Sequence, residues 1–135
     1  MIIGIGNDIA NIKRIEQSIE NFDKRFLNRI FADIEVAECE RRNKVSPRER
    51  ACAYAKRFAA KEACSKALGT GLRKGVFWRD MVISHQSSGK PELKLYGGAA
   101  RRLKEIVPEG KEGMIAVTIS DDYPFAIANV IIYAV

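Results

Sequence analysis

Three charged side chains stand close together in a stretch of sequence that is otherwise small and apolar. The segment RFAAKEACSKALGTGL, residues 57–72, places Lys61, Glu62 and Lys66 among alanines. In a helix, Glu62 and Lys66 share a face because they are four residues apart, whereas Lys61 lies about 100° around the helix from Glu62. These charges either form a solvated helix edge with one ion pair, or they hold a ligand that needs a carboxylate and two cations.

A second carboxylate favours the ligand. Asp8 follows the apolar run IIGIG, residues 2–6, which has the pattern of a short buried strand. Asp8 either caps the helical segment that follows or presents a carboxylate over a sheet edge. Mg²⁺ prefers oxygen ligands and usually keeps several waters and substrate phosphate oxygens, while lysines attract phosphate. Asp8 and Glu62, with Lys61 and Lys66 nearby, therefore suit a magnesium site for a phosphorylated ligand.

Other site chemistries lack support in the sequence. The cysteines Cys39, Cys52 and Cys64 have no metal-like spacing, and we expect free thiols in a reducing cytoplasm. The only histidine, His85, is expected to be a loop or edge residue. There is no G-x-x-x-x-G-K phosphate loop. A zinc site and a P-loop nucleotide site are therefore not predicted.

The composition is typical of a globular protein. Hydrophobic residues make up 47% of the 135 residues, which is enough for one core, so we expect one domain over residues 1–135. No apolar run reaches the roughly 18 residues of a membrane helix. The opening segment lacks the basic region and cleavage site of a signal peptide. We therefore expect a cytoplasmic protein with no membrane partner.

The net charge of +6 lies entirely in the first part of the chain, residues 1–75. Such a basic surface attracts nucleic acid, a phosphorylated ligand or an acidic protein. A small nucleic-acid-binding module would account for the charge, but the basic residues lack interleaved exposed aromatics and a known nucleic-acid motif. It would also leave the charged set in residues 57–72 unexplained. A catalytically inactive interaction subunit is a third hypothesis. We predict an enzyme that binds no nucleic acid.

The pattern of elements predicts an α+β fold in which an antiparallel sheet packs against a long helix. Helix signals include Asp33 as an N-cap, and Ser46, Pro47 and Gly69 as the cap, first residue and terminator of the longest helix. Strand signals are an apolar run or alternation of apolar and polar residues. The expected helices cover residues 9–16, 22–31, 33–43, 46–69 and 97–107, and the expected strands 2–6, 77–84, 92–97, 113–120 and 125–135, with a hairpin at 121–124.

Two longer motifs resemble one family. GIGNDIANIKRIE, residues 4–16, fits the pattern G-x-D, a spacer, then R-I. RFAAKEACSKALGTGL, residues 57–72, fits F-x-x-K-E-A-x-x-K-A-x-G-x-G. The segments RFLNRIF, WRDMVI, GKP and VTISDDYPFAIANVII stand in the same order as in that family. The chain therefore resembles the holo-[acyl-carrier-protein] synthases, the small bacterial class of 4′-phosphopantetheinyl transferases, over nearly all its length.

The resemblance implies a reaction and three catalytic residues. Such enzymes transfer 4′-phosphopantetheine from coenzyme A to a serine hydroxyl of apo-acyl carrier protein, release adenosine 3′,5′-bisphosphate and support fatty acid biosynthesis. Asp8 and Glu62 match the family's Mg²⁺ ligands, and Lys66 matches a lysine near the transferring phosphoryl group. The general base stays open between Glu62 acting directly and Glu62 acting through a metal-bound water.

The resemblance also assigns binding residues for coenzyme A. Arg57, Lys61 and Lys66 match basic positions that contact its phosphates, and Ser120 is a further contact. The family often carries a histidine near the last hairpin, where this chain has Asp121. This departure leaves the nucleotide contacts of that strand open.

The basic first part gains a candidate partner from the resemblance, because acyl carrier proteins are strongly acidic. Arg14 matches the family motif, and Arg25 and Arg29 are nearby basic residues, so we expect these three to dock the carrier protein. The alternative for Arg25 and Arg29 is a solvated basic face. The resemblance further implies a homotrimer with each active site between neighbouring subunits.

Overall fold

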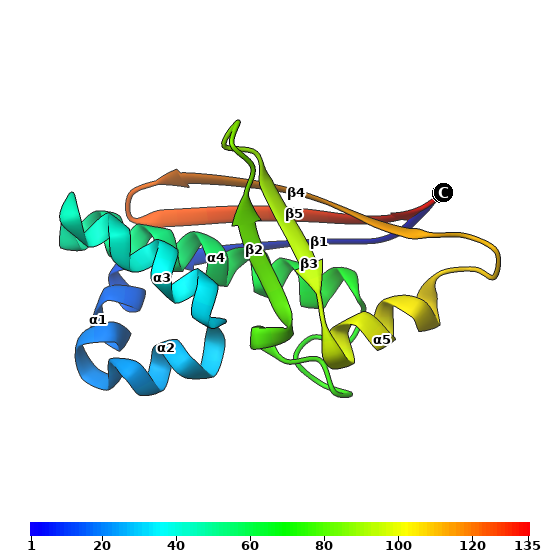
Figure 1. The fold of residues 1–135 in the computed structure, drawn as a ribbon, viewed down its shortest axis with the longest axis horizontal. Coiled ribbons are helices and arrows are strands. Elements are labelled where there is room, and N and C mark those ends of the chain that lie inside the picture. Colours follow the sequence, from blue (N-terminus) through cyan, green and yellow to red (C-terminus); the bar gives the residue numbers. More distant parts are fainter.

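One long helix and a three-stranded sheet form the centre of the computed structural model, which describes residues 1–135 (Figure 1). The helix α4 spans Pro47–Ala67 and packs against one face of an antiparallel sheet with the strand order β1-β5-β4. The remaining helices and a two-stranded hairpin, β2-β3, surround this pair. The elements are β1 (Ile2–Asn11), α1 (Ile12–Phe22), α2 (Lys24–Ile30), α3 (Asp33–Arg41), α4, β2 (Met81–His85), β3 (Pro91–Leu95), α5 (Gly97–Ile106), β4 (Gly113–Asp122) and β5 (Phe125–Ala134), with short 3-10 helices at Arg42–Lys44 and Trp78–Asp80.

The predicted α+β fold is confirmed, and the boundaries of α4 follow its predicted signals. The Ser46 hydroxyl accepts a hydrogen bond from the Glu49 backbone N–H at 3.0 Å, and Pro47 is the first helical residue. Beyond the last turn, Gly69 adopts a positive φ of 79°, which suits glycine at a helix terminus. The sheet covers one side of α4, while α3 and β2 contact it as well. This double coverage explains why most of the α4 circumference is small and apolar.

Two glycines let β1 approach α4 closely. A Cβ at Gly6 would lie 2.0 Å from the carbonyl oxygen of Ala63, and a Cβ at Gly4 would lie 2.0 Å from that of Ala67. Only hydrogen fits in these spaces, so the backbones of strand and helix touch directly. Because both glycines precede Asp8 on the same strand, this contact also fixes where the Asp8 carboxylate stands relative to α4.

Gly6→Ala is expected to push β1 away from α4. Forcing extra atoms into a packed interior costs about 1–3 kcal/mol, and here the atom that would have to move is backbone. We expect a loss of stability of that size, measured by urea unfolding. Unchanged stability would contradict the inferred close contact.

The structure changes several predicted element boundaries, beginning with those of β1 and α1. β1 continues past Gly6 to Asn11 because it pairs with β5 along its whole length, with Asp8 opposite Ala128. The cap of α1 is therefore Asn11, whose Oδ1 accepts a hydrogen bond from the Lys13 N–H at 2.9 Å. The alternative in which Asp8 caps this helix is wrong.

The expected strand over residues 77–84 also begins later than its pattern suggested. A 3-10 helix occupies Trp78–Asp80, and β2 starts only at Met81.

The N-cap of α3 is Ala32 rather than Asp33. The Glu35 carboxylate accepts a hydrogen bond from the Ala32 N–H at 3.0 Å. Asp33 is instead the first helical residue.

The cysteines lie in the interior and form no disulfide, as predicted. Burial raises the pKa of the Cys39 and Cys64 thiols to about 12 and that of Cys52 to about 11. These thiols are therefore protonated and poorly nucleophilic near neutral pH.

None of the helices combines the length and hydropathy that crossing a bilayer requires.

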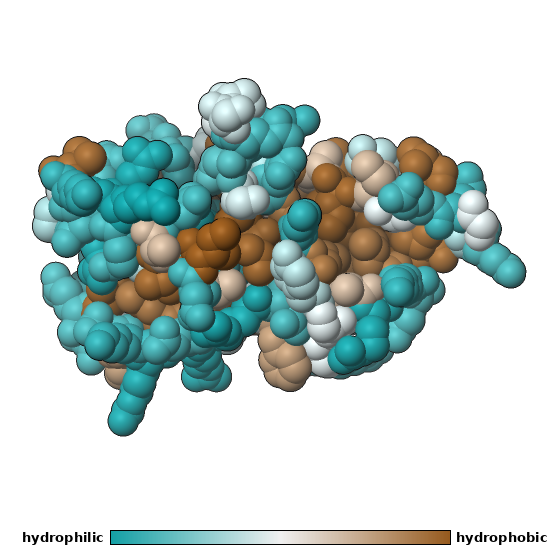
Figure 2. Space-filling model, viewed as in Figure 1, coloured by the Kyte–Doolittle hydropathy of each residue, from teal (hydrophilic) through white to brown (hydrophobic).

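Two surfaces of the molecule are markedly apolar. The sheet face that points away from α4 exposes large side chains, including Ile5 at 71% and Ile9 at 64% of their area. On another side, hydrophobic residues gather over β3, α5 and β4, whereas the end that carries α1–α3 is largely hydrophilic (Figure 2). A cavity of about 590 Å³ lies between these three elements. Apolar side chains from all of them line it, namely Leu93, Leu95, Leu103, Val107 and Ile115.

Candidate active site

Two of the predicted catalytic residues, Asp8 and Lys66, meet where β1 packs against α4. The Lys66 ammonium donates hydrogen bonds to Asp8 Oδ1 at 3.1 Å and to the Asn7 carbonyl at 3.0 Å. This ion pair joins the strand to the helix face that carries Glu62 one turn earlier. Lys66 therefore pairs with Asp8 across two elements, and the local Lys66–Glu62 pair considered from the sequence is absent. The Lys66 side chain is 51% exposed, so it can leave Asp8 for an incoming phosphate.

The Glu62 carboxylate is oriented by a residue that sequence reasoning missed. Trp78, in the 3-10 helix before β2, donates its indole N–H to Glu62 Oε1 at 2.9 Å. Glu62 Oε2 has no hydrogen-bond partner in the protein. One oxygen of the carboxylate is thus held in place while the other stays available to a ligand.

This donor set fits a magnesium ion. Asp8 and Glu62 offer hard carboxylate oxygens, and Mg²⁺ is commonly held by one or two carboxylates together with waters and substrate phosphates. No group of three or more histidine, cysteine or carboxylate side chains forms anywhere in the chain, so a closed protein-only metal cage is absent. The two carboxylates suit an ion that shares its coordination with a phosphorylated substrate.

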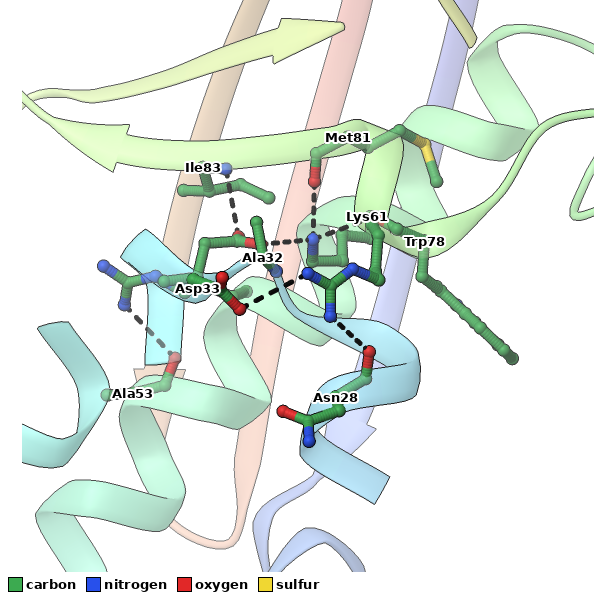
Figure 3. A network of polar contacts seen from close by, with 11 residues as sticks. Asn28, Ala32, Asp33, Ala53, Lys61, Trp78, Met81 and Ile83 are labelled. Carbon is green, nitrogen blue, oxygen red and sulfur yellow. Dashed lines mark hydrogen bonds and ion pairs between the residues drawn. The ribbon is translucent and has the colours of Figure 1, made fainter. Parts of the chain in front are cut away.

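Lys61 is part of the interior and not of the phosphate site, which corrects the sequence prediction. Its side chain is fully buried, as is that of Glu35 on α3, and their Nζ–Oε1 distance is 2.6 Å. The ammonium also donates hydrogen bonds to the backbone carbonyl oxygens of Trp78 at 2.9 Å and Met81 at 2.6 Å (Figure 3). With all three donors used and no exposed surface, Lys61 cannot contact coenzyme A in this conformation.

Burial lowers the pKa of Lys61, and the Glu35 carboxylate works against that shift. Glu35 also accepts the Ile83 backbone N–H at 3.1 Å. The buried pair therefore ties three elements together: α3 through Glu35, α4 through Lys61, and the segment from Trp78 to Ile83 through its backbone (Figure 3). Its role is to fix that segment, which carries Trp78, against α4.

Arg57 is also largely buried, at 5% exposure, but it borders a polar cavity of about 200 Å³. Its guanidinium donates to Glu38 at 3.2 Å and to the Ala53 carbonyl at 3.4 Å, and its Nε has no hydrogen-bond partner. Lys56 and His85 line the same cavity. Arg57 can therefore help bind an anion only from within this cavity, and its assignment to coenzyme A stays a prediction.

Ser120 and Asp121 lie on opposite faces of β4. Asp121 faces α4, where it pairs with Lys56 at 2.9 Å and accepts a hydrogen bond from the Cys52 thiol at 3.5 Å. The hydrogen bond from Lys56 is the main reason that the pKa of Asp121 lies below its ordinary value. Ser120 is exposed on the outer face, opposite Ile127 of β5. It is therefore not brought together with Asp8 and Glu62 within one chain.

The predicted carrier-binding arginines lie exposed on the two N-terminal helices. Arg14 is in the first turn of α1, whereas Arg25 and Arg29 on α2 line a cavity of about 380 Å³ together with Phe22 and Phe26. The Arg29 guanidinium lies 5.8 Å from the ring centroid of Trp78. The basic end of the molecule thus adjoins the residue that contacts Glu62.

Comparisons with known proteins agree with the motifs and the fold. Residues 4–128 match the model of the 4′-phosphopantetheinyl transferase superfamily. A holo-[acyl-carrier-protein] synthase from Rhizobium rhizogenes is 58% identical over 134 residues, covering 99% of this chain and 96% of the relative. The crystal structure of the Neisseria meningitidis synthase superposes with a TM-score of 0.81 at 35% identity, covering 98% and 99% of the two chains.

A second similar structure contains a ligand. The Helicobacter pylori holo-[acyl-carrier-protein] synthase, solved in complex with coenzyme A, has a TM-score of 0.78 and 31% identity, with coverage of 96% of this chain and 99% of that one. The α+β fold, the Lys66–Asp8 ion pair between α4 and β1 and these matches define the class of protein. The chain belongs to the 4′-phosphopantetheinyl transferase superfamily, as its motifs predicted. Within it, the chain is similar to the holo-[acyl-carrier-protein] synthases.

Proposed function

We propose that this protein transfers 4′-phosphopantetheine from coenzyme A to a serine of apo-acyl carrier protein, releases adenosine 3′,5′-bisphosphate and thereby serves fatty acid biosynthesis in the cytoplasm. The observation that carries the proposal is the Lys66–Asp8 ion pair between α4 and β1, with Glu62 one helical turn before Lys66 on the same face of α4. A carboxylate pair beside a half-exposed lysine is suited to the pyrophosphate of coenzyme A. The names of its relatives support the choice of carrier protein and coenzyme A.

In the proposed reaction the serine oxygen attacks the phosphorus on the pantetheine side of the pyrophosphate. The bond from that phosphorus to the bridging oxygen breaks, and this oxygen leaves with adenosine 3′,5′-bisphosphate. Asp8 and Glu62 would hold Mg²⁺, which when bound supplies positive charge to neutralise the pyrophosphate and its leaving group. Lys66 turns from Asp8 to the transferring phosphoryl group and stabilises its charge.

The proton of the serine hydroxyl needs an acceptor close to the reacting oxygen. Glu62 has an oxygen that no protein group engages, and its other oxygen is fixed by Trp78. We propose that Glu62 provides the general base, directly or through a water that it orients, because an oriented carboxylate within the site meets the geometric need of general base catalysis.

The arginines on α1 and α2 provide the proposed docking surface for the acidic carrier protein. Exposed Phe22 lies beside Arg25 and Arg29 in one shallow cavity, so the surface offers both charge and apolar contact. Arg14→Glu is expected to raise KM for the carrier protein roughly tenfold, at the lower end of what electrostatic steering contributes to association. KM for coenzyme A should stay unchanged. Equal increases for both substrates would contradict the docking role.

The exposed apolar face of the β1-β5-β4 sheet supports a homotrimer with shared active sites. Contiguous exposed apolar surface of this kind is typical of protein–protein interfaces. Light scattering should give three times the 15.1 kDa mass of one chain, and Ile5→Glu should dissociate the assembly by placing a charge on that face. A wild-type mass of one chain would contradict the trimer.

The reaction is tested most simply through its small product. Incubation with coenzyme A, Mg²⁺ and apo-acyl carrier protein should release adenosine 3′,5′-bisphosphate, detected by liquid chromatography. A carrier protein whose acceptor serine is replaced by alanine should release none. Equal release with both carrier proteins would indicate a coenzyme A hydrolase instead, and no release with either would contradict the proposal.

A further inference from the structure

We propose that Trp78 is a positioning residue for the metal site: its indole N–H fixes the Glu62 carboxylate in the orientation that binds Mg²⁺. This inference rests on the proposed function and adds to it a residue that belongs to neither motif of the chain. Trp78 is the only tryptophan in the protein. It lies at the start of a 3-10 helix, 16 residues beyond Glu62 in sequence.

The contact between the two residues is direct. Trp78 Nε1 lies 2.9 Å from Glu62 Oε1, a normal hydrogen-bond length. A glutamate side chain has several rotatable bonds, and a half-buried one on a helix face can point in more than one direction. The indole N–H selects one of these directions. It occupies one oxygen and leaves the other without a hydrogen-bond partner in the protein.

Trp78 is held through its backbone, and its ring has two side-chain neighbours. Its backbone carbonyl accepts a hydrogen bond from the buried Lys61 at 2.9 Å. Its ring lies against Phe58 with a centroid distance of 6.3 Å and an interplanar angle of 31°. The Arg29 guanidinium lies 5.8 Å from the ring centroid. The buried Lys61 therefore fixes the backbone of Trp78, and Phe58 and Arg29 lie near its ring.

This arrangement gives the buried Lys61–Glu35 pair a functional consequence. Lys61 also binds the Met81 carbonyl at 2.6 Å, so it anchors the chain on both sides of the 3-10 helix. This anchoring fixes the position of Trp78 along α4, next to Glu62. Hydrogen-bond partners of metal ligands commonly contribute 10–100-fold to metal affinity, so loss of the Trp78 indole N–H is expected to weaken Mg²⁺ binding.

The test is calorimetric titration of Mg²⁺ into the protein in the presence of coenzyme A, paired with the Mg²⁺ dependence of the rate. Trp78→Phe keeps an aromatic ring beside Phe58 but removes the N–H donor. It should weaken Mg²⁺ binding about tenfold or more, and the Mg²⁺ concentration that gives half of the maximal rate should rise by a similar factor. Phe58→Leu is the matched control, because it disturbs the same ring contact and keeps the donor; it should weaken binding much less. Trp78→His restores an N–H and should regain part of the affinity.

The outcomes separate this inference from the function on which it rests. Wild-type Mg²⁺ affinity in Trp78→Phe, or equal weakening in Trp78→Phe and Phe58→Leu, would overturn the positioning role while the transferase activity stands. A wild-type protein that neither binds Mg²⁺ nor needs it for transfer would overturn the metal site and this inference together. Thermal melting of each variant checks that it is folded. If Trp78→Phe does not fold, the Mg²⁺ affinity of Trp78→His compared with that of the wild-type protein provides the answer.

Discussion

Glu62→Ala reduces phosphopantetheine transfer by about 10³-fold or more at saturating substrates. A bound metal that neutralises transition-state charge contributes several kcal/mol, and each 1.36 kcal/mol corresponds to tenfold in rate. The proposed general base is lost in the same substitution. The variant should remain folded, since alanine is the best helix former and the only side-chain hydrogen bond lost is the one from Trp78.

The measurement is the steady-state rate of carrier-protein modification. Glu105→Ala is the matched control, because it removes an exposed carboxylate from another helix, where it forms only a weak pair with Arg102. That control should keep the wild-type rate. A folded Glu62→Ala variant with more than a tenth of wild-type activity would show that Glu62 neither binds the metal nor accepts the proton.

Lys61→Met destabilises the protein by about 3–5 kcal/mol, because removing one partner of a buried ion pair leaves the other charge without compensation. The partner here is Glu35, which has no exposed surface. Whole domains are stable by only about 5–15 kcal/mol, so this loss is a large share of the total. Urea unfolding followed by circular dichroism measures it.

Two further variants separate the buried pair from an ordinary salt bridge. Lys56→Met removes a lysine from the same helix, where it forms an ion pair with Asp121. Both side chains of that pair are more than a third exposed, so the substitution should lower the stability by less than about 1 kcal/mol. The double variant Lys61→Met/Glu35→Gln removes both charges and should recover part of the lost stability. A Lys61→Met variant as stable as Lys56→Met would contradict the structural role of Lys61.

The parts of the structure that were predictable from sequence are those set by local signals. Ser46 and Pro47 define the start of α4 and Gly69 its end through contacts within a few residues. The alternation of β4 and β5 likewise predicts two strands and the hairpin between them. Asp8 was placed correctly beside α4, although β1 runs on to Asn11 because its pairing with β5 is a long-range contact.

The errors arise where the partner of a residue is far away in sequence. Lys61 looks like a phosphate ligand from its neighbours, but its ion-pair partner, Glu35, lies 26 residues earlier. Only the folded chain reveals that both are buried. Trp78 was overlooked for the same reason, since its hydrogen bond to Glu62 spans 16 residues. Two signals could have drawn attention to it: it is the sole tryptophan, and it opens the segment WRDMVI that resembles the family.

The most direct test of the account is the intact mass of apo-acyl carrier protein after incubation with this protein, coenzyme A and Mg²⁺. Parallel samples contain EDTA or the folded Glu62→Ala variant. The account predicts a mass gain of one phosphopantetheine that appears only with Mg²⁺ and the wild-type protein. No gain with several carrier proteins, or a full gain in the presence of EDTA or with Glu62→Ala, would contradict the assignment of this site.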